Sequence, residues 1–182
     1  VRSKNDENLS EDEKGLRAIP EREGEKPRVV HLDKPAAEKK YVVNLVKTFM
    51  GSDPNHTVGI IAAKKAQIKT YGEWLASEGI AYEQVDPRST FSMAKPGVKV
   101  ASAFGAKGLE FDRVIIPMFV EGNFPWGHEP KDEEAKVEFL VKMRNLVYVS
   151  MTRAKSSLII TYCGDKGSRF LGEMDPDLYE RE

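Results

Sequence analysis

The sequence contains a single cysteine, Cys163, and no long apolar run. One cysteine cannot form an internal disulfide, and the first residues lack the basic and then apolar pattern of a secretory signal peptide. No stretch approaches the roughly 18 consecutive apolar residues that a membrane-spanning helix needs. These absences argue against a disulfide-stabilised or membrane-spanning protein, and they predict a reducing, cytoplasmic compartment and no membrane partner.

An excess of charge of one sign is also absent. Lys and Arg number 28, Asp and Glu number 29, and the formal net charge is -1. A nucleic-acid-binding domain usually has a basic excess or a basic stripe, so any contact with nucleic acid is expected to be local. The three histidines, His31, His56 and His128, lack the spacing of metal ligands, and no metal site is predicted.

Two glycine-rich phosphate-binding motifs are missing as well. Gly-x-x-x-x-Gly-Lys-Ser/Thr does not occur, so the loop and the lysine that hold β- and γ-phosphates would have to come from another segment. Gly-x-Gly-x-x-Gly does not follow the first predicted strand, which argues against a dinucleotide-binding enzyme. Because the chain begins with Val1 rather than Met, we expect it to be a piece of a longer protein.

What the sequence does show is the pattern of one α/β domain. Residues 1–27 are highly charged with few large apolar side chains, which predicts a linker or lead-in arm. Residues 28–182 alternate short Val/Ile-rich runs with stretches of helical period, which is typical of βαβ units and a mainly parallel sheet. The predicted strands are 28–32, 57–62, 81–85, 98–102, 113–117 and 157–162, and the predicted helices are 36–50, 64–77 and 133–154, the last with Val137, Leu140, Val141 and Val147 facing inward.

The fold class also predicts where the working residues lie. In α/β sheets of this kind ligands bind at the carboxyl ends of the strands, and we expect the site there. The acidic residues Asp132, Glu133 and Glu134 do not follow an apolar strand, so we interpret them as the start of the third helix, where they complement its dipole, rather than as a Mg²⁺ site.

One candidate stretch is Ala106-Lys107-Gly108-Leu109-Glu110-Phe111, between two predicted strands. Gly105 and Gly108 free the backbone for close approach to a ligand, Lys107 offers a cation to phosphate, and Glu110 can accept hydrogen bonds from a ribose. A plain solvated turn is the alternative.

A second candidate stretch, residues 144–154, lies near the end of the third predicted helix and contains Arg144 and Arg153. From spacing alone, an arginine there is first interpreted as capping carbonyls and complementing the helix dipole. It can instead act as an arginine finger, whose rigid guanidinium offsets charge on a transferring phosphoryl group.

The two stretches together resemble the UvrD/Rep family of superfamily 1 helicases. Motif V of that family is similar to Ser102-Ala103-Phe104-Gly105-Ala106-Lys107-Gly108-Leu109-Glu110-Phe111, and motif VI is similar to Tyr148-Val149-Ser150-Met151-Thr152-Arg153-Ala154. Glu121-Gly122-Asn123-Phe124-Pro125 resembles the family's Glu-Gly-x-Phe-Pro turn, and Ser168-Arg169-Phe170-Leu171 resembles the end of its closing strand and helix. Order and separation match, and the resemblance runs from Pro27 onward.

The resemblance implies a three-layer RecA-like (P-loop NTPase-type) domain, the second of two motor domains that enclose ATP. Glu110 would bind the ribose and Gly108 would let the backbone approach. Lys107 would lie near the phosphates or couple the two motor domains, and Arg153 would be the catalytic arginine at the γ-phosphate. ATP with Mg²⁺ would be held mainly by the first RecA-like domain of the same polypeptide, so the isolated chain is expected to be inactive. Arg144 falls on a motif VI arginine position, where it either shares this role or only forms supporting ion pairs.

The resemblance also implies a track for single-stranded DNA, with RNA left open. The family's Thr-x-His is replaced by a triplet in which Ser102 keeps a hydroxyl for a phosphate and Phe104 either stacks on a base or, as we favour, is buried. Lys64 and Lys65 stand where the family has DNA-contacting polar residues, or else form a solvated helix start. Trp126 stands where the family often has a DNA-contacting His, and it either stacks on a base or anchors its loop half-buried.

Only about a dozen residues separate Val85 from Val98, where the family commonly inserts a large accessory domain. The hypothesis is therefore the C-terminal motor domain of an ATP-dependent DNA helicase or translocase without that insertion. The alternative is a non-catalytic interaction module that retains the fold. The presence of both Glu110 and Arg153 favours the motor.

Overall fold

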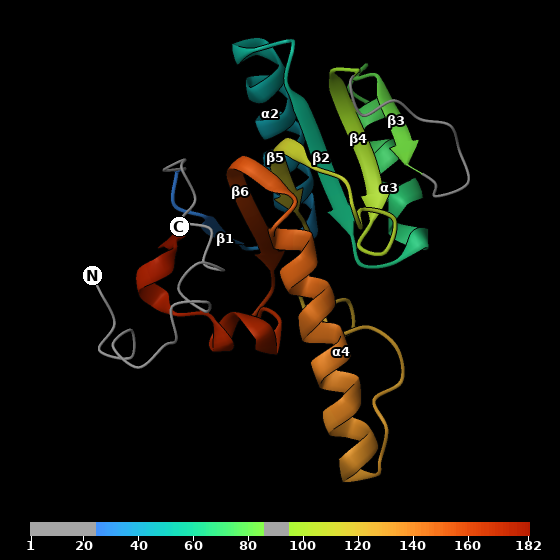
Figure 1. Ribbon diagram of the computed structural model, residues 1–182. Helices are drawn as coiled ribbons and strands as arrows, with labels where there is room; N and C mark the ends of the chain where they lie inside the picture. Colours follow the sequence, from blue (N-terminus) through green and yellow to red (C-terminus); the bar gives the residue numbers. More distant parts are fainter. Residues whose placement is uncertain (1–24, 86–94) are drawn as a thin grey trace, which may run out of the picture.

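The structure is a computed structural model that describes residues 25–85 and 95–182 (Figure 1). Most of the predicted lead-in arm, and most of the short connection after residue 85, lie outside the described residues. The elements are β1 (Arg28–Leu32), α2 (Pro35–Ser52), β2 (Thr57–Ala62), α3 (Lys65–Ala76), β3 (Tyr82–Val85), β4 (Gly97–Ser102), β5 (Phe111–Ile116), α4 (Glu133–Met151), β6 (Ala154–Cys163), the 3-10 turns η2 (Arg169–Glu173) and η3 (Pro176–Leu178), and β7 (Glu180–Arg181).

Seven strands form one sheet in the order β3-β4-β2-β5-β6-β1-β7, and every strand pair among the described residues is parallel. The prediction of an α/β domain with a mainly parallel sheet is confirmed, and all six predicted strands are present. The sequence analysis missed β7, because a two-residue strand of Glu180 and Arg181 has no apolar pattern to reveal it. Strands buried on both faces read as near-continuous apolar runs, which is why the inner strands were recognisable.

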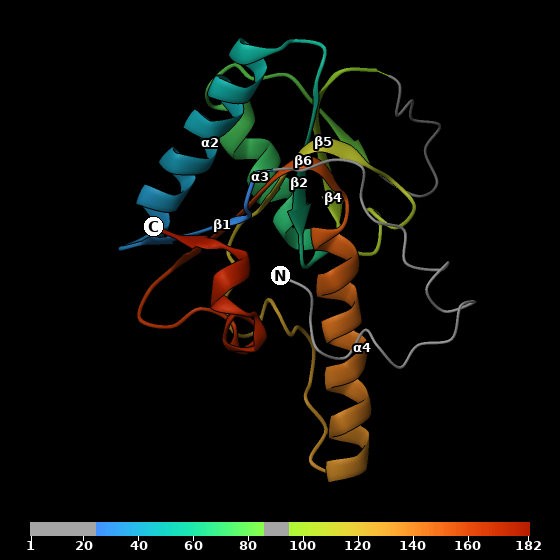
Figure 2. The ribbon, with the colours of Figure 1, turned by 60° about the vertical axis from the view of Figure 1, so that its left-hand side comes forward.

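Helices cover both faces of this sheet, which gives the three predicted layers (Figure 2). On one face α2 and α3 pack through a core that includes Val46, Ile68 and Leu75. On the other face the carboxyl half of α4 packs through Met143 and Val147. The acidic residues before α4 do begin the helix, since the Asp132 side chain accepts a hydrogen bond from the Ala135 N–H at 2.9 Å.

The amino half of α4 departs from the sequence prediction. Val137 and Val141 are 61% and 45% exposed, so the expectation that they face inward is wrong, whereas Val147 is buried as predicted. Figures 1 and 2 show the reason: α4 projects well beyond the edge of the sheet, and its first turns have no sheet to pack against. Helical period identifies an apolar face but does not say whether another layer covers it.

A buried carboxylate joins α2 to the carboxyl edge of the sheet. Glu38 is fully buried, and its Oε1 accepts hydrogen bonds from the Met118 N–H at 2.8 Å and the Thr161 hydroxyl at 2.6 Å. Met118 itself has a φ of 56°, an unusual value for a residue with a side chain. Burial and the nearby Glu38 carboxyl raise the pKa of the Cys163 thiol to about 11, so this thiol stays protonated at neutral pH.

Candidate nucleotide and nucleic-acid sites

The motif V stretch runs from one edge of the sheet to the other. Strand β4 ends at Ser102, whereas β5 begins at Phe111 on the opposite edge because the strands are parallel. Residues 103–110 therefore cross a face of the sheet, and Ala103 and Ala106 are fully buried along the way. We call residues 103–110 the crossover segment. Its first residues lie at the carboxyl edge of the sheet and its last residues lie at the amino edge.

The nucleotide candidates lie at the amino edge. An open pocket there is lined by Asn55, Thr57, Gly108, Leu109, Glu110, Asp112 and Lys155. Thr57 opens β2 and Lys155 is the second residue of β6, so the expectation that these candidates lie at the carboxyl ends of the strands is wrong. Gly108 has a φ of 79°, which a residue with a Cβ adopts only with strain. Lys107 is exposed on the same segment but does not line the pocket.

Arg153 binds the crossover segment directly. Its Nη1 donates to the Leu109 carbonyl at 3.0 Å and its Nε donates to the Val149 carbonyl at 2.9 Å. Its own carbonyl accepts from the Phe111 N–H at 2.8 Å. In this structure the guanidinium thus caps carbonyls at the end of α4, as the first interpretation of the spacing expected. The same contacts place it beside Gly108 and Glu110, the two residues expected to share its ligand.

The charges around the pocket alternate in sign. The exposed Glu110 carboxylate lies 4.0 Å from the Lys155 ammonium. Burial alone would raise the pKa of Asp112, but hydrogen bonds from the Thr57 N–H at 2.7 Å and the Thr57 hydroxyl at 2.8 Å lower it below its ordinary value. Lys155 lowers it further. The pocket therefore offers one cation and two carboxylates to a polar ligand.

The nucleic-acid candidates lie at the carboxyl edge. Phe104 is 51% exposed, so the favoured expectation of burial is wrong. Ala103 and Ala106 take the buried positions of the turn, and Phe104 is left on the solvent side, in edge-to-face contact with Trp126. The two ring centroids are 6.0 Å apart and the planes meet at 86°. Trp126 is half-buried, and its Nε1 is buried without a hydrogen-bond partner among the described residues.

The remaining candidates share this edge. Ala62 and Ser102 are paired across β2 and β4, so Lys64 and Lys65 begin α3 near the start of the crossover segment. Lys65 is exposed and Lys64 is partly buried. Ser102 is nearly buried, and its hydroxyl accepts a hydrogen bond from the Gly105 N–H at 3.0 Å, so it also holds the turn.

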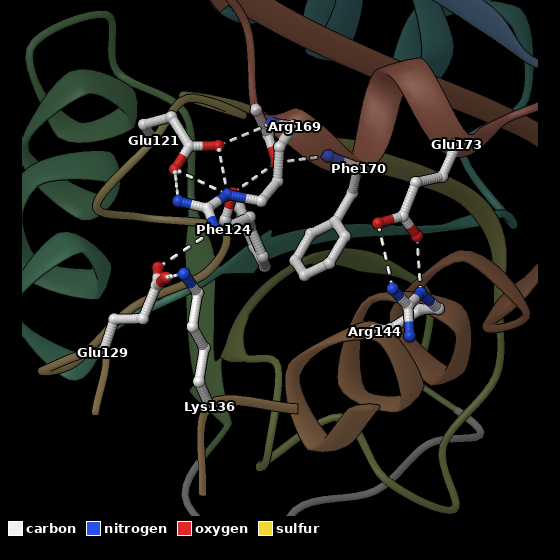
Figure 3. Close-up of polar contacts among 9 residues, drawn as sticks. Glu121, Phe124, Glu129, Lys136, Arg144, Arg169, Phe170 and Glu173 are labelled. Carbon is white, nitrogen blue, oxygen red and sulfur yellow. Dashed lines mark hydrogen bonds and ion pairs between the residues drawn. The ribbon is translucent and has the colours of Figure 1, made fainter. Parts of the chain in front are cut away.

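Several residues with contacts at these sites, Thr57 and Asp112 of the pocket among them, had no role predicted from the sequence. Asn55 and Lys155 line the amino-edge pocket, and Lys155 could have been noticed because it follows Arg153 by two positions. Arg169, within the Ser-Arg-Phe-Leu signature, binds Glu121 (Figure 3). Figure 3 also shows that Arg144 pairs with Glu173, a supporting ion pair of the kind considered for it.

Comparisons with known proteins show what this chain is similar to. Residues 88–165 match the family model of the UvrD-like helicase C-terminal domain. This stretch of the chain is therefore similar to the UvrD-like helicase C-terminal domain. The ATP-dependent DNA helicase PcrA of Bacillus subtilis is 32% identical over 108 residues, which are 54% of this chain and 14% of that protein. A probable DNA helicase II homolog of Mycoplasma capricolum is 37% identical over 95 residues, 47% of this chain and 13% of that protein.

Solved structures support the fold of the chain. The C-terminal domain of a possible DNA helicase from Lactobacillus plantarum WCFS1 superposes with a TM-score of 0.65 at 24% identity, covering 87% of this chain and 86% of that one. The DEAD-box protein SrmB of E. coli gives 0.55 at 12% identity, covering 88% and 92%. These likenesses show the RecA-like helicase fold that the sequence predicted.

The chain spans about a seventh of the length of the curated relatives that it matches. The family match and the relatives agree with the predicted helicase C-terminal domain, and a non-catalytic interaction module is not favoured. Within residues 25–85 and 95–182, no helix has the length and apolar character to cross a membrane, and no cluster of three or more His, Cys, Asp or Glu side chains could hold a metal ion.

Proposed function

We propose that this UvrD-like domain supplies the second half of an ATP site and part of a single-stranded DNA track in a longer helicase. The observation that carries the proposal is the crossover segment, which has a nucleotide candidate pocket at one end and the exposed Phe104, in contact with Trp126, at the other. A motor needs such a connection, because nucleotide state has to change the grip on the strand. ATP with Mg²⁺ would be bound mainly by a first RecA-like domain of the same polypeptide.

At the amino edge, Glu110 would accept hydrogen bonds from the ribose hydroxyls, and Gly108 would let the backbone approach the nucleotide. Lys107 would lie near the phosphates. The Arg153 guanidinium would exchange its bond to the Leu109 carbonyl for bonds to the γ-phosphate. The phosphate competes well for this guanidinium, because it carries the opposite charge and can accept two parallel hydrogen bonds, whereas the carbonyl is neutral and accepts one.

This exchange would release one end of the crossover segment. Leu109 belongs to that segment and Phe104 lies five residues before it, so a change at the phosphate would be passed along those five residues to the strand track. At the carboxyl edge, Phe104 and Trp126 would stack on bases, while Lys64 and Lys65 would meet phosphates. Ser102 would hold the turn and offer its hydroxyl to the strand.

The test is single-strand-stimulated ATP hydrolysis by the full-length polypeptide, comparing the unaltered protein with Arg153→Ala. An arginine finger contributes roughly 10³- to 10⁵-fold to turnover, so kcat should collapse on that scale while nucleotide binding is largely kept. Arg153→Lys should recover little, since an ammonium does not reproduce the planar fork. Arg28→Ala, which removes an exposed pair with Glu182, is the matched control. Equal turnover in Arg153→Ala and the unaltered protein would contradict the assigned role.

A further inference from the structure

The loop that carries Trp126 is closed at its base. Residues 121–129, here called the tryptophan loop, leave the sheet after β5 and lead into α4. Phe124 is buried in this loop and stacks on Phe119, with ring centroids 4.8 Å apart. Trp126 follows two residues later and reaches Phe104. The position of the indole therefore depends on how the two ends of the loop are held.

One guanidinium holds both ends. The Nη2 of Arg169 lies 3.0 Å from an oxygen of Glu121, the first residue of the tryptophan loop, and the Nη1 lies 3.0 Å from an oxygen of Glu129, its last residue (Figure 3). The backbone N–H of Arg169 also donates to Glu121 at 2.6 Å. A rigid planar fork that satisfies two carboxylates at once fixes their separation, which a flexible ammonium cannot do.

A neighbouring contact fixes the middle of the loop. The Ser168 hydroxyl donates to the Phe124 carbonyl, and the Ser168 N–H donates to the Phe119 carbonyl at 2.9 Å. The Glu-Gly-x-Phe-Pro and Ser-Arg-Phe-Leu signatures, which the ATP site does not use, are therefore one unit in space. Together their contacts fix the position of the segment between Phe124 and Glu129.

Stability alone does not account for this arrangement. The Arg169 side chain is 41% exposed and its partners Glu121 and Glu129 are 44% and 30% exposed. Ion pairs with that much solvent contribute little to the free energy of unfolding. Their geometric effect is undiminished by solvent as long as the bonds persist, and here that effect falls on an aromatic side chain beside the exposed Phe104.

We propose that Arg169 is a positioning residue that closes the tryptophan loop and so holds Trp126 against Phe104 as one stacking surface for the bases of a single strand. The proposal rests on the proposed strand track at the carboxyl edge. Base stacking on aromatic rings is tolerant of sequence, because every base has a π-face. The surface would thus suit a protein that moves along a strand rather than one that reads it.

The experiment uses the fluorescence of Trp126 in the chain. The sequence has two tryptophans, and Trp74→Phe leaves Trp126 as the sole tryptophan, excited selectively over the tyrosines, while keeping a ring next to Tyr71. Titration with oligothymidylate should quench that emission, and the anisotropy of a labelled strand should report total binding. Arg169→Ala in this background should lose most of the quenching and bind the strand about tenfold more weakly, the scale of one lost base stack.

Three further variants separate positioning from general damage. Glu121→Gln combined with Glu129→Gln should reproduce Arg169→Ala from the other side of the contact, and Arg169→Lys should fall between the two extremes. Arg144→Ala is the matched control, because it removes a comparable two-point arginine pair, with Glu173, that does not touch the tryptophan loop. It should leave quenching unchanged. Circular dichroism and urea midpoints measure the folded fraction of each variant, so that all titrations use the same concentration of folded protein.

The outcomes are distinguishable. Undiminished quenching in Arg169→Ala would overturn the positioning role. A labelled strand that binds the parent chain without quenching Trp126 would overturn the stacking surface while leaving a track. A parent chain that binds no strand at all would overturn the track itself, and the role of Arg169 with it.

Discussion

The two edges of the sheet differ in the chemistry that they present. The amino edge has fixed charges, with the Glu110 carboxylate and the Lys155 ammonium lining an open pocket and the Arg153 guanidinium bound to the Leu109 carbonyl beside it. The carboxyl edge presents rings, with Phe104 on the surface and Trp126 beside it. Fixed charges suit a ligand whose groups are always the same, such as a nucleotide. Rings suit a ligand whose bases change at every step.

The crossover segment serves both kinds of site, although it is short. Because the strands are parallel, a chain that leaves β4 must return across the sheet to begin β5, and here it does so in eight residues. The motif V stretch is thus a physical link between the edges as well as a set of contacts. Variants that disturb one edge while sparing the other test this separation.

The largest expected effect is at the carboxyl edge. Glu38→Ala would leave the Met118 N–H and the Thr161 hydroxyl buried without their acceptor, and each such loss costs about 1–3 kcal/mol. We expect the free energy of unfolding to fall by about 3 kcal/mol in urea denaturation at pH 7. Glu138→Ala, on the exposed face of α4, is the control and should change it by less than about 0.5 kcal/mol. If Glu38→Ala lowered the free energy of unfolding no more than the control does, a structural role for the carboxylate would be contradicted.

The next effect is at the amino edge. Gly108→Ala places a Cβ at a φ of 79°, which should cost about 1 kcal/mol of stability and distort the backbone beside the pocket. We expect weaker nucleotide binding by the full-length protein, measured by titration with a fluorescent ATP analogue. In the chain that also carries Trp74→Phe, oligothymidylate should still quench the emission of Trp126 in the absence of nucleotide. Loss of that quenching would show that the two edges are not separable. Gly51→Ala, a helical position with free space around it, is the control and should be neutral or slightly stabilising.

The smallest effect is a change in acid sensitivity. Because the pKa of Asp112 is lowered in the folded state, its carboxylate stabilises the protein above the unfolded-state pKa of about 3.9, and this contribution disappears as pH falls through the lower folded value. Asp112→Asn should therefore be less stable than the unaltered chain at pH 6, with the gap narrowing below about pH 4. Urea midpoints between pH 3 and pH 6 measure it. A gap that stays constant over that range would rule out this contribution.

Local chemistry made much of the fold predictable. Val/Ile-rich runs marked the buried strands, and helical period placed α2 and α3 within two residues of their observed ends. The edge of the nucleotide pocket was not predictable in the same way, because it depends on which strands pair and in which direction. Strand pairing and direction depend on residues far apart in the sequence. The expectation that ligands bind at the carboxyl ends of strands therefore placed Gly108 and Glu110 at the wrong edge of the sheet.

Exposure was the second limit. Phe104 is apolar and follows a buried strand, so burial was the natural expectation, yet the small side chains around it filled the interior first. Val137 and Val141 repeat at helical spacing, but the sheet ends before it reaches them. Sequence pattern gives the preference of a side chain, whereas the space available to it is decided by the rest of the fold.

Helix α4 has a mechanical consequence. Its 19 residues make a rod about 28 Å long at 1.5 Å per residue, and its buried side chains, Met143, Val147 and Ser150, all lie in the half that ends next to Arg153. Such a rod is a lever with its fulcrum at the pocket end. A tilt of about 10° there would move the amino end of α4 by about 5 Å. A small rotation at the pocket would therefore become a displacement of about one helical pitch at the far end.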